Sequence, residues 1–208
     1  MTEPQLPLVF IVSGPSGSGK STLVQRLLDL PGTMYSTSCT TRPPRVTESK
    51  GKCYHFVSEA EFERRVAQDE FLEHARVFGK HYYGTPRKWL DEARRKKLDL
   101  VLEIDVQGAA QVKDKLPEAV ALFIVPPSRA ELERRLRERG QDSTEEIERR
   151  LSRARDEIMA FSKYYDYCVV NDDIERAGSE VQSIVTAARC SSARNGERVQ
   201  KLLESFGG

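Results

Sequence analysis

The stretch Gly14-Pro15-Ser16-Gly17-Ser18-Gly19-Lys20-Ser21 decides the fold. It fits the phosphate-binding pattern G-x-x-x-x-G-K-[ST]. An apolar run at residues 8–12 precedes it and is typical of a buried strand, whereas residues 21–28 are typical of a helix. In this strand, loop and helix context, we expect the loop N–H groups to surround an anion at the positive end of the helix dipole. A glycine-rich turn with a chance lysine is the alternative, and the context favours nucleotide binding.

Two residues of this stretch have specific expected roles. Lys20 is expected to reach the outer phosphates of a nucleoside triphosphate, and the Ser21 hydroxyl is expected to bind Mg²⁺.

Composition bounds the class of protein. The chain has 208 residues, which suits one domain with insertions. Its 33 Lys and Arg residues nearly balance its 32 Asp and Glu residues, so the charge indicates neither nucleic acid nor a membrane as a partner. The four cysteines form no C-x-x-C pair, which argues against a zinc site or redox pair. Without a basic leader or an apolar run of about 18 residues, the sequence predicts a cytoplasmic protein.

Strand-like and helical patterns alternate along the chain. Apolar runs at 8–12, 100–104, 120–125 and 167–170 are separated by helical patterns. This alternation predicts an α/β fold, with a parallel sheet covered by helices on both faces. The predicted core covers about 6–34, 96–127 and 161–190.

Other segments depart from this alternation. Residues 35–95 mix short strand-like pieces with a helix from 58, which indicates an inserted mixed α/β subdomain. Residues 128–160 read as two charged helices, and the polar tail 191–208 as ending in a short helix over 197–206.

Capping residues mark the expected helix boundaries. Three pairs have capping-box spacing: Ser58 with Glu61, Ser128 with Glu131, and Ser143 with Glu146. Thr85 followed by Pro86 predicts another helix start, and Gly140 predicts a helix end.

The run from Thr40 to Arg45 contains two prolines. They favour an extended path with three residues per turn, which places Arg42 and Arg45 on one side. Two guanidinium groups on one side suit a phosphate, in this case that of an acceptor. A solvated proline-rich loop is the alternative.

The two helices of 128–160 are rich in arginine. Arg135 and Arg139 share a helix face, and Arg149, Arg150 and Arg153 follow the Gly140 break. An exposed, salt-bridged helix pair is one interpretation. A mobile lid that brings arginines to a transferring phosphoryl group is the other, and the few apolar residues here fit it.

An acidic residue, Asp105, ends the apolar run from Leu100. The carboxyl ends of such strands are where α/β proteins bind ligands. Its alternative role is to cap the turn at Gln107 and Gly108.

Taken together, the motifs resemble those of the guanylate kinase family. The segments GPSGSGKST, SCTTRPPR, FLEHA, YYGT, LEIDVQG and VVNDD occur in the order typical of that family, over roughly residues 8–190. The resemblance implies a P-loop core, a monophosphate-binding subdomain at 35–95 and a helical lid at 128–160. It implies transfer of the γ-phosphoryl group of ATP to GMP, and also to dGMP, giving GDP and ADP with Mg²⁺, in purine metabolism and GMP recycling.

The resemblance also implies residue roles. The residues for ATP are Gly14, Pro15, Ser16, Gly17, Ser18, Gly19, Lys20, Ser21, Thr22 and Asn171, with Asn171 against adenine. Those for GMP are Ser38, Arg42, Arg45, Glu48, Tyr54, Glu73, Tyr83, Thr85 and Asp105. The catalytic set is Lys20, Arg42, Arg135, Arg139 and Arg150. Ser21 would bind Mg²⁺, with Glu103 or Asp105 contributing through water.

The sequence departs from the family pattern in two places, and its tail after residue 190 carries no motif of the family. Glu103 stands where many members carry Asp, and the stretch at 78–82 is one residue longer than is common. We choose Tyr83 over Tyr82 for the GMP phosphate, because it adjoins Gly84.

Two other functions fit part of the pattern. A related P-loop kinase with another acceptor, such as a ribose bisphosphate kinase, would keep the loop but would not need a guanine-reading set. A non-catalytic module that binds phosphorylated peptides typically has a degraded loop, whereas Gly19, Lys20 and Ser21 are intact here. Assembly into a homo-oligomer is left open by the sequence.

Overall fold

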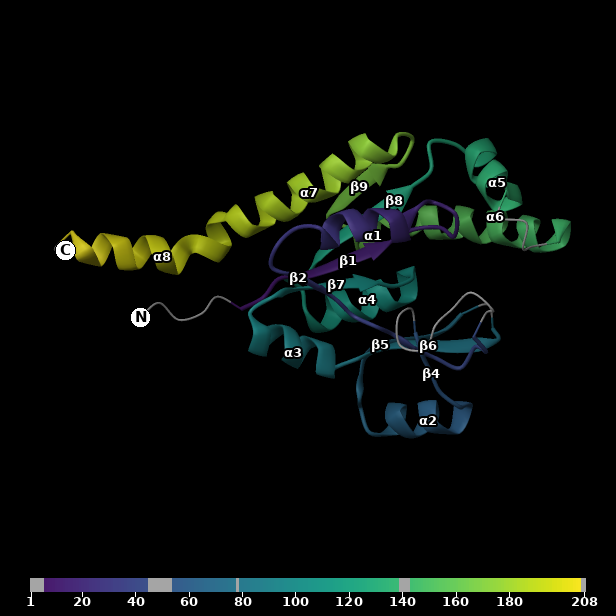
Figure 1. The fold of residues 1–208 in the computed structure, drawn as a ribbon, viewed down its shortest axis with the longest axis horizontal. Helices are drawn as coiled ribbons and strands as arrows, with labels where there is room; N and C mark the ends of the chain where they lie inside the picture. Colours follow the sequence, from purple (N-terminus) through teal and green to yellow (C-terminus); the bar gives the residue numbers. More distant parts are fainter. Residues whose placement is uncertain (1–5, 45–53, 78, 139–142, 207–208) are drawn as a thin grey trace.

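The computed structural model describes residues 6–44, 54–77, 79–138 and 143–206. Among these residues, five strands form a sheet in the order β2-β7-β1-β8-β9 (Figure 1). Their bounds are Val9–Ser13 for β1, Thr33–Tyr35 for β2, Asp99–Glu103 for β7, Val120–Val125 for β8 and Tyr167–Val170 for β9. Each neighbouring pair is parallel, which confirms the predicted sheet. The edge strand β2 was not predicted.

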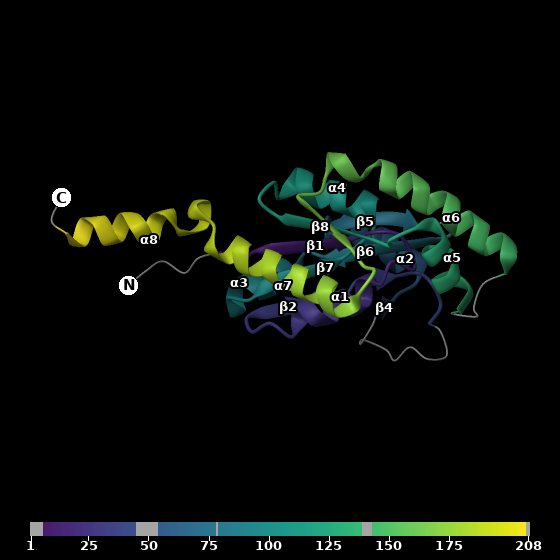
Figure 2. The ribbon, with the colours of Figure 1, turned by 90° about the horizontal axis from the view of Figure 1, so that it is seen from above.

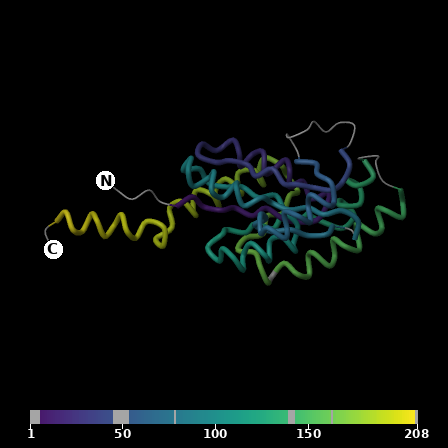
Figure 3. The backbone as a smooth tube through the Cα atoms, turned by 90° about the horizontal axis from the view of Figure 1, so that it is seen from below, coloured from purple at the N-terminus to yellow at the C-terminus, as the bar shows by residue number. Residues whose placement is uncertain are grey.

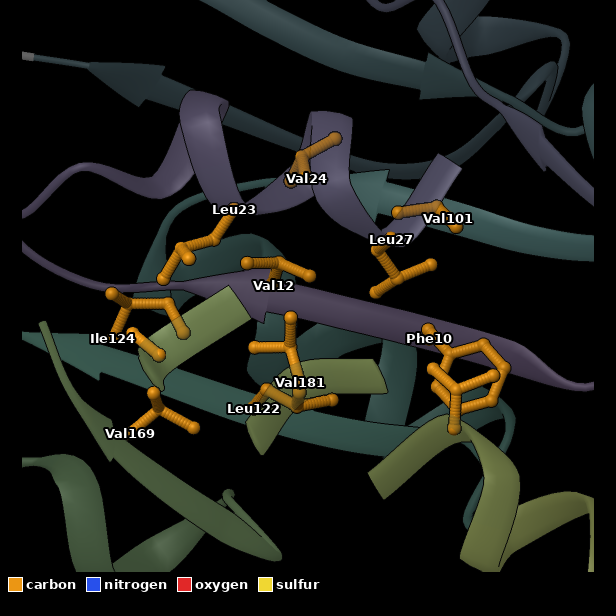
Figure 4. Packing of buried hydrophobic residues seen from close by; sticks show 12 residues of the cluster. Phe10, Val12, Leu23, Val24, Leu27, Val101, Leu122, Ile124, Val169 and Val181 are labelled. Carbon is orange, nitrogen blue, oxygen red and sulfur yellow. The ribbon is translucent and has the colours of Figure 1, made fainter. Parts of the chain in front are cut away.

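Helices cover both faces of this sheet. On one face, α1 (Lys20–Leu28) and α7 (Ile174–Cys190) pack against β1. Side chains of Phe10 and Val12 from the strand meet Leu23 and Leu27 from α1, as Figure 4 shows. On the other face, α3 (Lys88–Lys96) and α4 (Val106–Lys115) pack against Ile11 and the residues around it. Alternation along β1 therefore supplies both layers of the core.

A second, smaller sheet lies within the predicted insertion. Its strands run in the order β4-β3-β6-β5, with bounds His55–Phe56, Cys39–Thr40, His81–Pro86 and Phe71–Val77. Helix α2 (Glu59–Ala67) covers it through Phe62, which stacks on Phe71 with ring centroids 4.5 Å apart. The chain therefore has a separate mixed α/β unit at this point, as predicted.

The charged segment forms two helices, α5 (Arg129–Glu138) and α6 (Thr144–Met159). They pack on each other through a small cluster that includes Leu132, Leu136, Ile147 and Leu151. Figure 2 shows them at the end of the molecule opposite the C-terminal helix. A short 3-10 helix, Phe161–Lys163, leads from α6 toward β9.

Most of the predicted helix starts are confirmed. The hydroxyl oxygens of Ser58, Ser128 and Ser143 each accept a hydrogen bond from the main-chain N–H three residues later. The predicted end at Gly140 lies outside the described residues.

One predicted helix start was wrong. Thr85 and Pro86 belong to β6, and α3 begins at Lys88 after Arg87. Thr85 pairs with Glu73 across the β5–β6 hairpin, and this tertiary pairing outweighs the local capping signal.

The chain ends in α8 (Ser192–Ser205), which begins before the predicted residue 197. It extends away from both sheets (Figures 1 and 3), and none of its residues is buried. Leu202, Leu203 and Phe206 are exposed. In the part of the chain that the structure describes, no helix is both long and apolar enough for a membrane span.

Candidate nucleotide-binding site

A cavity of about 330 Å³ opens at the carboxyl ends of β1 and β7, between the two sheets. One wall is lined by six loop residues, Gly14, Ser16, Gly17, Gly19, Lys20 and Ser21, and the inserted unit contributes Ser38, Glu73 and Tyr83 to the other. Arg153 of α6 also lines it. Ligands of parallel α/β folds bind at this edge, so the position of the cavity agrees with the sequence prediction.

The glycines of the loop occupy places that a side chain would block. Gly14, Gly17 and Gly19 have φ of 144°, 97° and 91°, which disfavour other residues. A Cβ at Gly14 would collide with the main-chain carbonyl of Ile124. The Lys20 ammonium group donates to the carbonyl oxygens of Gly14 and Pro15 at 2.6 and 2.8 Å, so it lies across the cradle that the phosphates would occupy.

Asn171 contacts this loop through a buried side-chain amide. It is 4% exposed, and its side-chain Nδ2 donates to the Ser18 carbonyl oxygen at 2.7 Å. The main-chain carbonyl oxygen of Asn171 accepts from Arg135 Nη2 at 2.8 Å. A Cβ at Gly19 would collide with the same amide. The structure thus assigns Asn171 a role in holding the loop, and its contact with adenine stays a prediction.

Oxygen atoms suited to Mg²⁺ gather beside the loop. The Ser21 hydroxyl donates to Glu103 Oε1 at 2.7 Å, which brings the start of α1 to the end of β7. In the described ranges, His, Cys, Asp and Glu side chains form no cluster of three or more that could hold a metal. A magnesium ion usually keeps waters and takes only one or two protein ligands besides the phosphates, so Ser21 and Glu103 fit such an ion. Asp105 contacts Gly108 and Arg153 instead.

Three of the predicted monophosphate residues come together beside the cavity, where Tyr54 and Tyr83 line it and Arg42 contacts both. Arg42 Nε donates to the Tyr83 hydroxyl at 3.1 Å, and its guanidinium lies 5.6 Å from the Tyr54 ring centroid. The aromatic rings hold the guanidinium in place. Arg45 and Glu48 lie outside the described residues, so their roles stay predictions.

The choice between the two tyrosines agrees with the geometry. Neighbouring strand residues point to opposite faces of a sheet. Tyr83 lines the cavity, whereas Tyr82 stacks on Phe62 with ring centroids 5.3 Å apart.

A buried chain of polar groups lines the wall predicted to read the base. The Ser38 and Thr85 hydroxyl oxygens are 3.2 Å apart, and Thr85 donates to Glu73 Oε1 at 2.7 Å. Glu73 is 3% exposed. Burial raises the pKa of its carboxyl group to about 7, against the opposing hydrogen bond from Thr85. Nothing intrinsic in the local sequence marks Glu73, because its importance comes from this tertiary burial; only the resemblance to the family, through the FLEHA segment, pointed to it.

Asp105 is fixed by two partners. Its Oδ1 accepts from the Gly108 N–H at 3.0 Å, which caps α4 as the alternative interpretation predicted. Its Oδ2 pairs with Arg153 Nη2 at 3.2 Å. Asp105 lines the same cavity, and its predicted roles toward GMP and Mg²⁺ stay predictions. Arg153 is one of several arginines that follow Gly140 in the sequence, and no sequence pattern predicted this pair.

Arginines of α5 and α6 reach the loop. Arg135 Nη1 lies 3.5 Å from the Ser18 carbonyl oxygen, and Arg150 Nη1 donates to the Ser16 hydroxyl at 2.9 Å. Arg139 lies outside the described residues. The helix pair therefore contacts the phosphate loop through two of the three predicted lid arginines, and its role as a lid stays a prediction.

A parallel sheet, an intact phosphate loop and a facing wall whose tyrosines hold Arg42 define a P-loop kinase of small acceptors. The comparisons with known proteins then give the family. Residues 7–188 match the family model for guanylate kinase, and the chain belongs to the guanylate kinase family.

Individual relatives agree. The chain is 48% identical to a guanylate kinase of Myxococcus xanthus, over 97% of this chain and 95% of the relative. It is 52% identical to a guanylate kinase of Neisseria meningitidis, over 95% of this chain and 96% of the relative. The solved guanylate kinase of Anaplasma phagocytophilum is similar in structure, with a TM-score of 0.76 at 36% identity, covering 97% of this chain and 95% of that one.

Proposed function

We propose that this protein transfers the γ-phosphoryl group of ATP to GMP, giving ADP and GDP. The observation that carries this proposal is one cavity with the phosphate loop on one wall and Ser38 and Glu73, which the buried Thr85 hydroxyl links, on the other. Family membership supports the same reaction. A bound Mg²⁺ would neutralise charge on the ATP phosphates.

At the donor end, the loop N–H groups and Lys20 hold the ATP phosphates. Lys20 exchanges its two loop carbonyl partners for phosphate oxygens when ATP enters. Ser21 and Glu103 would supply oxygens to the metal. These groups orient the terminal phosphate and stabilise negative charge without forming a covalent intermediate.

At the acceptor end, Arg42 and Tyr83 hold the GMP phosphate. The guanidinium neutralises an anion that must attack another anion. The phosphate oxygen is itself the nucleophile, so the mechanism needs positioning more than a general base.

Guanine selection follows from the buried carboxylate. Guanine presents N1–H and N2–H donors side by side, and an ionised Glu73 can accept both. Adenine lacks this pair of donors and would leave the carboxylate buried without partners, which is costly. The Thr85 and Ser38 hydroxyls fix the carboxylate and add hydrogen-bonding capacity toward the base.

Arginines of α5 and α6 complete the site. Arg135 and Arg150 already touch the loop, and small shifts of the helix pair would bring them onto the phosphates. Closure would also exclude water, which competes as an acceptor.

An acceptor panel tests the proposal. The purified protein is given ATP and Mg²⁺ with GMP, dGMP, AMP or a ribose phosphate, and ADP release is followed. We expect rapid ADP release with GMP and dGMP, and about 1,000-fold lower kcat/KM with AMP. Equal rates with AMP, or release only with the sugar phosphate, would overturn it.

A further inference from the structure

Gly108 faces the carboxylate proposed to read the base, although its backbone conformation does not require glycine. Gly108 lies in the first turn of α4, and its N–H donates to Oδ1 of Asp105, the N-cap of the helix. Helical backbone suits any residue, and Gly108 is not among the glycines with positive φ. The reason for glycine at this position must therefore be space.

The three heavy atoms nearest to the space beside Gly108 all belong to the Glu73 side chain. A Cβ built at Gly108 would lie 2.5 Å from Glu73 Oε2, 3.0 Å from its Cδ and 3.4 Å from its Cγ. The first distance is well inside van der Waals contact. The carboxyl group of Glu73 thus occupies the volume that an ordinary side chain at position 108 would take.

Glu73 is held from the other side by Thr85. The Thr85 hydroxyl donates to Oε1, while Gly108 faces Oε2. Thr85 is fully buried and Glu73 is nearly so. The carboxyl plane is therefore set between a hydroxyl and the bare face of a helix.

We propose that Gly108 is a specificity-determining positioning residue. Its missing side chain lets the Glu73 carboxylate take the place from which it reads guanine. This inference rests on the proposed function and adds to it a residue outside the predicted site.

The structure also indicates what a methyl group at position 108 would do. The clashing atoms are the flexible end of Glu73, whereas at Gly14 they are main-chain atoms. A flexible end can move, so Gly108→Ala displaces the carboxylate and leaves the fold in place. The cost then falls on guanine recognition.

Steady-state kinetics test this. For Gly108→Ala we expect KM for GMP to rise about tenfold with kcat within about twofold, because the base contacts act in binding. Preference for GMP over inosine monophosphate, which lacks the 2-amino group, should fall at least about fivefold. Gly178→Ala is the matched control, since the three atoms nearest to a Cβ there are Arg26 side-chain carbons at 3.4 Å or more, which is ordinary van der Waals contact.

A double-mutant cycle separates positioning from general damage. Glu73→Asp shortens the side chain by one methylene and draws the carboxylate away from position 108. Gly108→Ala should then lower kcat/KM for GMP less in the Glu73→Asp background than in the wild type. An equal loss in both backgrounds would overturn the proposal, as would a wild-type KM or an unfolded Gly108→Ala protein. If the wild-type protein did not phosphorylate GMP, the proposed function itself would fail.

Discussion

Arg153 of α6 forms an ion pair with Asp105 at the start of α4, with Nη2 and Oδ2 3.2 Å apart. The two side chains are 26% and 21% exposed, so solvent screens them only in part. Arg153 also pairs with Glu157 at 3.0 Å. The pair connects α6 to the wall that carries Glu73, because burial and, to a smaller extent, the charge of Asp105 raise the pKa of Glu73.

Removing Arg153 should therefore change the pKa of Glu73 through Asp105. In Arg153→Met, Asp105 loses its compensating charge, and we expect the midpoint of the pH profile of kcat/KM for GMP to rise by about half a unit. Arg149→Met is the control, since Arg149 is exposed on the same helix and pairs with Glu146. A midpoint shared by both variants and the wild type would contradict the coupling.

The pH dependence of GMP use follows from Glu73. Burial raises its pKa to about 7, with Asp105 adding to the shift and Lys115 and Thr85 opposing it. Guanine donors need the ionised form, so kcat/KM for GMP should fall as pH drops below about 7, approaching tenfold per unit. The GMP phosphate also titrates, near about pH 6. The Glu73→Gln variant shows the pH dependence that comes from the GMP phosphate alone. If its pH profile were identical to that of the wild type, Glu73 would not be the group that controls GMP use.

Folding stability should favour the protonated form of Glu73, whereas GMP binding needs the ionised form. A carboxyl whose folded-state pKa is raised binds its proton more tightly in the folded state, so it lowers stability as pH rises from about 4.5 to about 7. Glu73→Gln removes this loss, and we expect it to gain up to about 3 kcal/mol relative to wild type at pH 8 compared with pH 4. Urea unfolding at the two pH values measures the difference. The same difference at both pH values would contradict the raised pKa.

The Ser21–Glu103 contact predicts a metal effect. Glu103→Gln weakens the oxygen set beside the loop, so half-maximal activity should require roughly tenfold more Mg²⁺. Rates at saturating Mg²⁺ should recover most of the wild-type value. Glu118→Gln, at an exposed position, serves as the control. An unchanged Mg²⁺ requirement in Glu103→Gln would remove Glu103 from the metal site.

Local patterns in the sequence predicted much of the fold. The phosphate loop, four strands of the parallel sheet and three serine caps follow from short-range signals that the structure confirms. The edge strand β2 has three residues, too few for a clear period. Thr85 shows the limit of local reasoning, since its cap-like neighbourhood was overridden by pairing with Glu73 across the hairpin.

The candidate site was predictable only where a motif carried it. Loop residues and Arg42 have types and spacing that fit phosphate directly. The roles of Glu73 and Gly108 depend on a contact between a strand and a helix that the sequence does not encode locally. The Arg153–Asp105 pair likewise joins residues 48 positions apart.

A crystal structure with ADP and GMP bound together tests the central claim most directly. The account predicts the GMP phosphate within hydrogen-bonding distance of Arg42 and Tyr83, and the N1–H and N2–H edge of guanine on the Glu73 carboxylate. The ADP phosphates should lie in the loop of residues 14–21. A structure with GMP elsewhere, and with the Arg42 guanidinium turned away from any phosphate, would contradict the account.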